Sequence, residues 1–414
     1  MKLPEKSTLE AIYGESKTAM TRYEALAQNY EKLFGAGEAA FFSAPGRSEL
    51  IGNHTDHNGG LVIAASIALD TIGAAVPNGT DVIHIVSEGY GQEITVDLND
   101  LQGSAKRGST EALVAGMMEG AVKLGFKAAG FNAYITTNVI RAAGVSSSAS
   151  FEMLVCAVIN HYFNGDAMTP ILYAKIGQYA ENVYWNKASG LMDQMACAVG
   201  GAISLDFSDE REPTYEKLDL SFEKLGYHMV IVNTGKGHAD LSGEYSSVPQ
   251  EMRAVATALG VHRLCETNEE ALLAKPELIE KLGNDRAVLR AFHFFEENKR
   301  VKRAAAAVAT GDTAEILEQL EASGRSSWEW LQNCYSLQNC KEQKISLTLS
   351  LTELFLKKLG AGICRVHGGG FAGVILAVVP AAESQSYCTY IAQYVGAENV
   401  YPMRIRSTGA VQVQ

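Results

Sequence analysis

The sequence lacks the features of several common classes of protein. It carries 35 basic against 47 acidic residues, a net charge of −12, so it has no excess of positive charge for a nucleic acid or an anionic membrane. Its 7 cysteines are scattered without a CxxC pair, which argues against a disulfide framework or a zinc site. No segment reads as a signal core or a membrane span. We expect a cytoplasmic protein; a monomer and a homo-oligomer are both consistent with the sequence.

Two nucleotide-binding signatures are also missing. The chain has no GxxxxGK[ST] stretch and is therefore not a P-loop protein. Residues 368–373 (GGGFAG) are rich in glycine, but an apolar strand pattern follows them. A dinucleotide fingerprint lies between a strand and a helix, so a dehydrogenase is the weakest interpretation.

The length and the periodicity favour two domains of mixed secondary structure. A chain of 414 residues is too long for one ordinary core. Helical periodicity covers residues 7–35, 170–187 and much of 249–359, with a domain boundary near 207–213. Strands are expected at 41–44, 61–64, 82–86, 131–137, 229–232, 364–379 (a pair) and 400–405. Helices interleaved with scattered strands predict an α+β fold.

A loop of small residues at 144–150 (GVSSSAS) leads into a helical pattern. The free N–H groups and the positive dipole end of a helix N-terminus favour an anion such as phosphate. Serine hydroxyls can also reach a magnesium ion. A serine-rich helix cap without a ligand is the alternative for this loop taken alone.

Many polar side chains stand between the glycines of residues 46–60, where Pro45 and Gly46 predict a turn after a short strand. We expect a binding loop that offers hydrogen bonds to several hydroxyl groups. A metal site made by His54, Asp56 and His57 is less favoured, because three ligands within four residues rarely converge outside a helix. Farther on, Glu181 lies on the helix that begins at Pro170. Asp193 follows it and, taken alone, would be interpreted as a helix cap.

The order of these motifs resembles the GHMP sugar-kinase superfamily, and closely its galactokinase branch. The similar segments are 44–60, 144–150 with Glu152, 242–245, 368–373 and 407–410. The resemblance implies a two-domain GHMP kinase fold with the active site in the interdomain cleft. The expected parts are a helical extension over 1–35, an N-terminal domain over 36–212 and a C-terminal domain over 213–414.

The resemblance also implies an activity and the residues that carry it. Family members transfer a phosphoryl group from ATP to the C1 hydroxyl of galactose. Asp193 matches the catalytic aspartate beside that hydroxyl, and Arg47 matches the arginine that faces it. Ser148 and Glu181 match the Mg²⁺ ligands. The sugar contacts fall on Asn53, His54, Thr55, Asp56 and Tyr245. The ATP phosphates fall on Ala142, Ala143, Gly144, Val145, Ser146, Ser147 and Ser148.

The sugar loop departs from the family pattern. Galactokinases usually carry Glu where Asn53 stands, Val-Asn where Ser48 and Glu49 stand, and often Tyr at His57. The missing carboxylate normally accepts a hydrogen bond at the C6 end of the sugar. Galactose is still our first expectation; a kinase for a relative such as galacturonate is the alternative, because plant galacturonate kinases also lack that Glu. A sensor that binds sugar and ATP without turnover is a third, which the presence of Arg47, Ser148, Glu181 and Asp193 disfavours.

Overall fold

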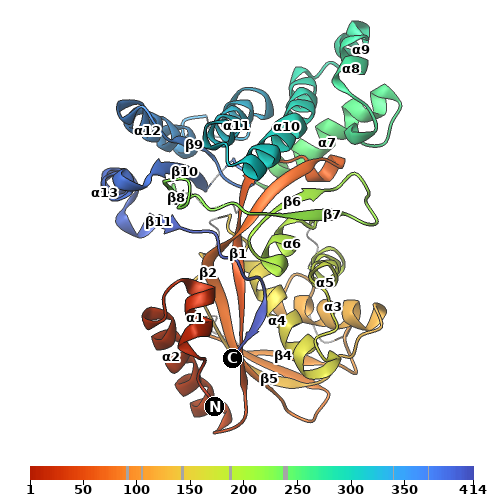
Figure 1. The fold of residues 1–414 in the computed structure, drawn as a ribbon. Coiled ribbons are helices and arrows are strands. Elements are labelled where there is room, and N and C mark those ends of the chain that lie inside the picture. Colours follow the sequence, from red (N-terminus) through yellow and green to blue (C-terminus); the bar gives the residue numbers. More distant parts are fainter. Residues whose placement is uncertain are drawn as a thin grey trace.

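Two β-sheets lie in opposite halves of the molecule, and both chain ends lie in the half that holds β4 and β5 (Figure 1). The computed structural model describes residues 1–89, 93–103, 106–140, 144–185, 189–235, 241–338, 340–371 and 373–414. Among the described helices, none is both long and apolar enough to cross a membrane. The α+β class predicted from the sequence is confirmed.

The first sheet is mixed and contains the two longest strands of the described chain. Its strands run in the order β12-β1-β2-β5-β3-β4, with β6 paired to β2 and β7 paired to β6. Among the described strands of this sheet, β3 and β5 pair in parallel and the other pairings are antiparallel. The strands are β1 Ala40–Ile51, β2 Leu61–Pro77, β3 Val82–Ser87, β4 Glu93–Asp97, β5 Phe131–Thr137, β6 Ala202–Asp206, β7 Thr214–Leu218 and β12 Val411–Val413.

Helices cover both faces of this sheet because its strands alternate apolar residues on both sides. On β5, Ala133 and Ile135 face one core with the helices α3–α5, while Tyr134 faces another core with α1 and α2. The helices of this half are α1 Lys6–Tyr13, α2 Lys17–Phe34, α3 Thr110–Lys123, α4 Ser147–Asn164, α5 Pro170–Val183 and α6 Met192–Val199.

The second sheet is antiparallel in the order β11-β8-β10-β9. Its strands are β8 Tyr227–Asn233, β9 Ile363–Val366, β10 Val374–Pro380 and β11 Val400–Met403. Its helices are α7 Ser242–Leu259, α8 Glu269–Leu273, α9 Pro276–Leu282, α10 Asp285–Thr310, α11 Thr313–Ser326, α12 Lys344–Leu359 and α13 Ser384–Val395. Short turns of 3₁₀-helix complete the chain, with one π-helical turn, η3, at Ser327–Leu331.

The N-terminal helices pack on the first sheet. Tyr13 of α1 donates a hydrogen bond to the buried carboxylate of Asp70 on β2, at 2.6 Å. Arg22 of α2 contacts the same carboxylate at 2.8 Å, and Arg406, near the C-terminus, contacts it at 2.9 Å. Both ends of the chain are therefore tied to one buried group.

The prediction of a turn at Pro45 and Gly46 is wrong. Strand β1 continues through these residues to Ile51, with an irregular register between Pro45 and Arg47. A β-bulge absorbs an extra residue without ending the strand, so the Pro-Gly pair interrupts the ladder only locally. The first residues of the polar stretch 46–60 are consequently strand core, and only the part after Ile51 forms a loop.

Candidate functional site

Strand β1 carries two charged side chains into the centre of the molecule. Residues 47–49 pair in regular register with β2. Alternate residues of a strand share a face, so Arg47 and Glu49 point the same way and Ser48 the other. The side chains of Arg47 and Glu49 are buried, with the residues 6% and 5% exposed. Gly46 permits close packing here, since an added Cβ would lie 2.7 Å from the carbonyl oxygen of Val145.

Asp193 forms an ion pair with Arg47. Asp193 lies in the first turn of α6. Its Oδ1 atom is 2.9 Å from Nε and 2.8 Å from Nη2 of Arg47. Ser146 donates a hydrogen bond to Oδ2, and Nη1 of Arg47 donates one to the carbonyl oxygen of Gly144. The predicted catalytic pair thus touches the loop that precedes α4.

The serine loop forms the N-terminus of α4, as the sequence predicted. The helix begins at Ser147, and Ser146 before it adopts a left-handed conformation with φ 59°. Ser148 in the first turn donates a hydrogen bond to Oε1 of Glu181 on α5, at 3.2 Å. The two residues predicted to hold magnesium are therefore adjacent. Ala142 and Ala143 fall outside the described residues.

A cavity of about 210 Å³ opens beside these groups. Both halves of the chain line it, because Tyr245 of α7 and Gly369 of the β9–β10 connection join residues of the first half. It adjoins a larger hollow of about 770 Å³ that shares Asp56 and His57 with it. Its described lining is Arg47, Glu49, His54, Asp56, His57, Glu181, Ser189, Gly190, Met192, Asp193, Gln194, Tyr245 and Gly369.

Three of the five predicted sugar contacts line this cavity, namely His54, Asp56 and Tyr245. Thr55 does not, because its hydroxyl donates inside the turn to the carbonyl oxygens of Gly52 (2.9 Å) and Leu61 (2.8 Å). Both Thr55 and Asn53 are fully buried, at 0% exposure. These two residues therefore lie outside the described lining of the cavity.

Asn53 is held by hydrogen bonds to other protein groups. Its Nδ2 atom donates to Oε1 of Glu49 at 2.7 Å and to the carbonyl oxygen of Gly368 at 2.6 Å. Its Oδ1 atom accepts from Asn333 at 2.6 Å, and its backbone carbonyl accepts from Nε2 of His293 at 2.9 Å. Asn53 thus links the sugar loop to the second half of the chain.

Burial and neighbouring charges set the protonation of the site. Burial alone would lower the pKa of Arg47, but Asp193 and Glu49 more than offset this and raise it, so the guanidinium stays charged. Burial lowers the pKa of His54 to about 4. A neutral His54 donates through Nε2 to the carbonyl oxygen of Gly369, at 2.8 Å. In the described lining, the guanidinium of Arg47 is the one positively charged Arg or Lys side chain.

The residues present fit a magnesium ion shared with phosphates. Ser148 and Glu181 offer a hydroxyl and a carboxylate oxygen, the hard ligands that Mg²⁺ prefers. Mg²⁺ usually takes only one or two carboxylates and completes its shell with phosphate and water. The described residues hold no group of three or more His, Cys, Asp or Glu side chains that could bind a metal by themselves. The metal site suggested for His54, Asp56 and His57 is therefore not supported.

Sequence reasoning missed Glu49 as a lining residue. It missed Gln194 too, whose Nε2 atom donates to Oε2 of Glu181 at 3.2 Å. A strand through residues 47–49 places Glu49 on the same face as Arg47, but the polar composition of this segment is typical of a loop. Gln194 directly follows the predicted catalytic aspartate, and its amide could have been expected to orient a neighbouring carboxylate.

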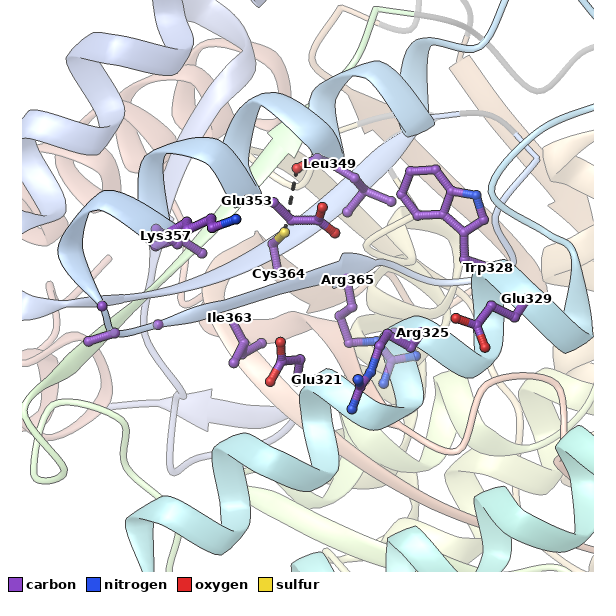
Figure 2. A pocket seen from close by; sticks show the side chains of 15 residues that line it. Glu321, Arg325, Trp328, Glu329, Leu349, Glu353, Lys357, Ile363, Cys364 and Arg365 are labelled. Atoms are coloured by element: carbon purple, nitrogen blue, oxygen red, sulfur yellow. Dashed lines mark hydrogen bonds between the residues drawn. The ribbon is translucent and has the colours of Figure 1, made fainter.

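A larger cavity of about 800 Å³ lies away from these groups, between α11, η3, α12 and β9. Figure 2 shows Glu353 and Lys357 on the helix above it, and Glu321 and Arg325 on the helix below. Cys364 at its base donates to the carbonyl oxygen of Leu349 at 3.7 Å (Figure 2). Its described lining includes none of the predicted site residues, so we do not assign the chemistry to it.

Comparisons with known proteins agree with this geometry. The family model described as "Galactokinase galactose-binding signature" matches residues 28–77, and that of the GHMP kinases N terminal domain matches residues 112–201. A galactokinase of Limosilactobacillus reuteri (strain DSM 20016) is 32% identical over 382 residues, covering 89% of this chain and 92% of the relative. A galactokinase of Lactococcus lactis subsp. lactis (strain IL1403) is 30% identical over 380 residues, covering 89% and 90%.

Solved structures show the same similarity. The Lactococcus lactis galactokinase complexed with galactose superposes with a TM-score of 0.80 at 27% identity, over 94% of this chain and 99% of that one. The mevalonate kinase of Methanococcus jannaschii superposes with a TM-score of 0.62 at 14% identity, over 90% and 99%. The second likeness extends to the fold alone.

Proposed function

This chain belongs to the galactokinase family of the GHMP kinases, and we propose that it transfers the γ-phosphoryl group of ATP to the C1 hydroxyl of galactose. One observation carries the assignment of the site. The Arg47–Asp193 pair lines the same cavity as Glu181, directly beside the N-terminus of α4. An acceptor for a hydroxyl proton and a site for phosphate oxygens thus lie next to each other.

The proton of the sugar goes to Asp193 in this proposal. The C1 hydroxyl donates a hydrogen bond to the carboxylate of Asp193, which takes the proton as the oxygen attacks the γ-phosphorus. ADP leaves from the opposite side of that phosphorus. Arg47 fixes the carboxylate through Oδ1 and stabilises the negative charge on the transferred group. Phosphoryl transfer needs little beyond this alignment and charge stabilisation.

The serine loop holds the phosphates of ATP in this proposal. The first N–H groups of a helix have no partner within it and point toward an anion placed at its N-terminus. Residues 144–148 precede or open α4 and so offer both N–H groups and hydroxyls. Ser148 and Glu181 would hold Mg²⁺, which when bound neutralises charge on the β- and γ-phosphates.

Two further parts of the proposal concern organisation and location. We divide the chain at residues 35 and 212 into a helical extension and two kinase domains, with the cavity between the two domains. Pairing of β12 with β1 returns the last residues to the first sheet. We place the enzyme in the cytoplasm, and the free thiols of all 7 cysteines support a reducing compartment.

The proposal is tested with the purified protein, ATP, Mg²⁺ and galactose. We expect ADP release that depends on galactose and a product whose phosphorus-31 spectrum shows attachment at C1. The matched control omits the sugar and measures hydrolysis of ATP by water. Binding of both ligands without ADP release would instead support the sensor alternative.

A further inference from the structure

The cavity contains a carboxylate that the family pattern does not predict. Glu49 lines the cavity, and its Oε1 atom accepts a hydrogen bond from Asn53 at 2.7 Å. Its other oxygen, Oε2, makes no hydrogen bond within the described part of the chain. Asn53 lies behind it, is fully buried and has both Nδ2 hydrogens engaged by Glu49 and Gly368. Glu49, rather than Asn53, therefore presents a polar group to the cavity.

Relative to the usual galactokinase pattern, the two residue types have exchanged places. The family usually has an amide at position 49 and a carboxylate at position 53, and this chain has the reverse. The hydrogen bond between the two side chains shows that they are in direct contact. A carboxylate and an amide can therefore trade positions while the pair retains one negative charge.

Strand geometry places Glu49 at the far side of the sugar from the reacting oxygen. Two residues along a strand span about 7 Å. Arg47 and Glu49 are two residues apart on one face of β1, and Arg47 holds Asp193. A pyranose ring is of similar width, so a sugar with its C1 hydroxyl at Asp193 brings its C4–C6 edge toward Glu49.

We propose that Glu49 is the specificity-determining carboxylate of this enzyme, accepting a hydrogen bond from a hydroxyl on the C4–C6 edge of galactose through Oε2. Asn53 acts as a positioning residue that holds Oε1. The inference rests on the proposed function and names the substrate class of that site: a neutral hexose with a free hydroxyl on that edge.

The charge balance of the cavity opposes an acidic sugar. In its described lining, the carboxylates of Glu49, Asp56, Glu181 and Asp193 stand against one guanidinium, that of Arg47. Burial raises the pKa of Glu49, while Arg365, the amide of Asn53 and Arg47 act in the opposite direction. A uronate would bring a further carboxylate to the C6 position beside Glu49, and like charges in a buried site repel strongly. Galacturonate is therefore disfavoured as a substrate.

The test compares kcat/KM for galactose, 6-deoxygalactose, 4-deoxygalactose and galacturonate between the wild type and Glu49→Gln. A hydrogen bond to a charged group predicts that the wild type loses roughly 10- to 100-fold on one of the two deoxy sugars. In Glu49→Gln this penalty should fall severalfold, and KM for galactose should rise while kcat is largely kept. The ratio of kcat/KM for galacturonate to that for galactose should increase. Glu119→Gln, a partly buried glutamate on α3, is the matched control and should keep the wild-type ratios.

A purely structural role for Glu49 would lower activity on all four sugars by the same factor, and unchanged ratios would overturn the proposal. If Glu49→Gln does not fold, Glu49→Asp is used instead. It keeps the charge, but its side chain is one methylene shorter, so the carboxylate lies farther from the sugar. That variant should bind galactose more weakly and still reject galacturonate; acceptance of galacturonate would also overturn the proposal.

Calorimetric binding of the same sugars separates this inference from the proposed function. If the wild type binds galactose with a Glu49-dependent preference but releases no ADP, the kinase proposal fails and the role of Glu49 stands. If it phosphorylates galactose and the deoxy-sugar ratios are the same in the wild type and in the Glu49 variants, only the role of Glu49 fails.

Discussion

The guanidinium of Arg47 holds one oxygen of Asp193 through two nitrogens, with Nε at 2.9 Å and Nη2 at 2.8 Å from Oδ1. The residues are 146 positions apart in sequence. Because both contacts go to Oδ1, the other oxygen faces the serine loop, where Ser146 donates to it. An incoming sugar hydroxyl can take the place of Ser146 at Oδ2 without breaking the ion pair.

Replacement of Arg47 by lysine should therefore cost turnover more than binding. Lysine keeps the charge but lacks the planar fork that reaches Asp193 and Gly144 together. We expect kcat to fall about 10²- to 10³-fold, as when a preorganised donor is removed from an active site. Steady-state kinetics measure this, with the exposed Arg325→Lys as control. A lysine variant with the wild-type kcat would contradict the role given to Arg47.

Replacement of Glu181 by glutamine should weaken the use of magnesium. The amide is a poorer ligand than the carboxylate that faces Ser148. The Mg²⁺ concentration for half-maximal rate should rise about 10-fold or more, in the range seen when groups around a metal are altered. Initial rates over a magnesium series measure it, and Glu119→Gln should leave the curve in place. An unshifted curve would exclude Glu181 as a ligand.

Stability should fall in mild acid through His293. Burial lowers the pKa of His293 from 6.5 to about 4. Its neutral ring bonds to the carbonyl oxygen of Asn53 and to Ser326. The unfolded state therefore takes up the proton first, and stability present above pH 6.5 is lost as pH falls toward 4.

The loss attributed to this one ring is about 2 kcal/mol between pH 7 and pH 5. Urea unfolding at both pH values measures it. In His293→Gln this part of the pH dependence should disappear, whereas the exposed His262→Gln should behave as the wild type. An equal slope in all three proteins would show that His293 does not carry the effect.

Asp70 should be essential for stability but remote from the reaction. Its carboxylate is fully buried and contacts Arg22, Arg406 and Tyr13. Asp70→Asn removes one charge and leaves the fully buried guanidinium of Arg406 and the partly buried one of Arg22 uncompensated, which costs about 3–5 kcal/mol of unfolding free energy. Tyr13→Phe deletes one hydrogen bond and should cost about 1 kcal/mol. Urea titrations measure the unfolding free energies of the two variants. A larger loss in Tyr13→Phe than in Asp70→Asn would contradict the role given to Asp70.

Local patterns predicted much of this fold. The strand at 131–137 and the helix beginning at Pro170 appear as expected, because strict alternation and a proline at the first helical position are local signals. The end of β1 could not be predicted in this way. Pro45 and Gly46 usually form a turn, but here pairing with β2 on one side and close packing against Val145 keep them in the strand.

The site could be predicted in part from the resemblance of its motifs to the family. Arg47, Asp193, Ser148 and Glu181 could be named because each matches a family motif. The fold brings Arg47, Asp193 and Glu181 to one cavity and places Ser148 in contact with Glu181. That Glu49 rather than Asn53 lines the cavity could not be deduced from the motif alone. It depends on Asn53 being engaged by Gly368 and Asn333, residues about 300 positions away that only the fold brings near.

A single-turnover experiment on Asp193→Asn tests the central claim most directly. Enzyme in excess over labelled ATP is mixed with saturating galactose, and sugar phosphate is measured after acid quenching, while ATP affinity is measured separately. If Asp193 takes the proton from C1 in the cavity shared with Arg47, the rate of sugar phosphate formation should drop about 10²- to 10⁴-fold. ATP affinity should stay essentially unchanged. Sugar phosphate formed at the wild-type rate by this variant would contradict the account.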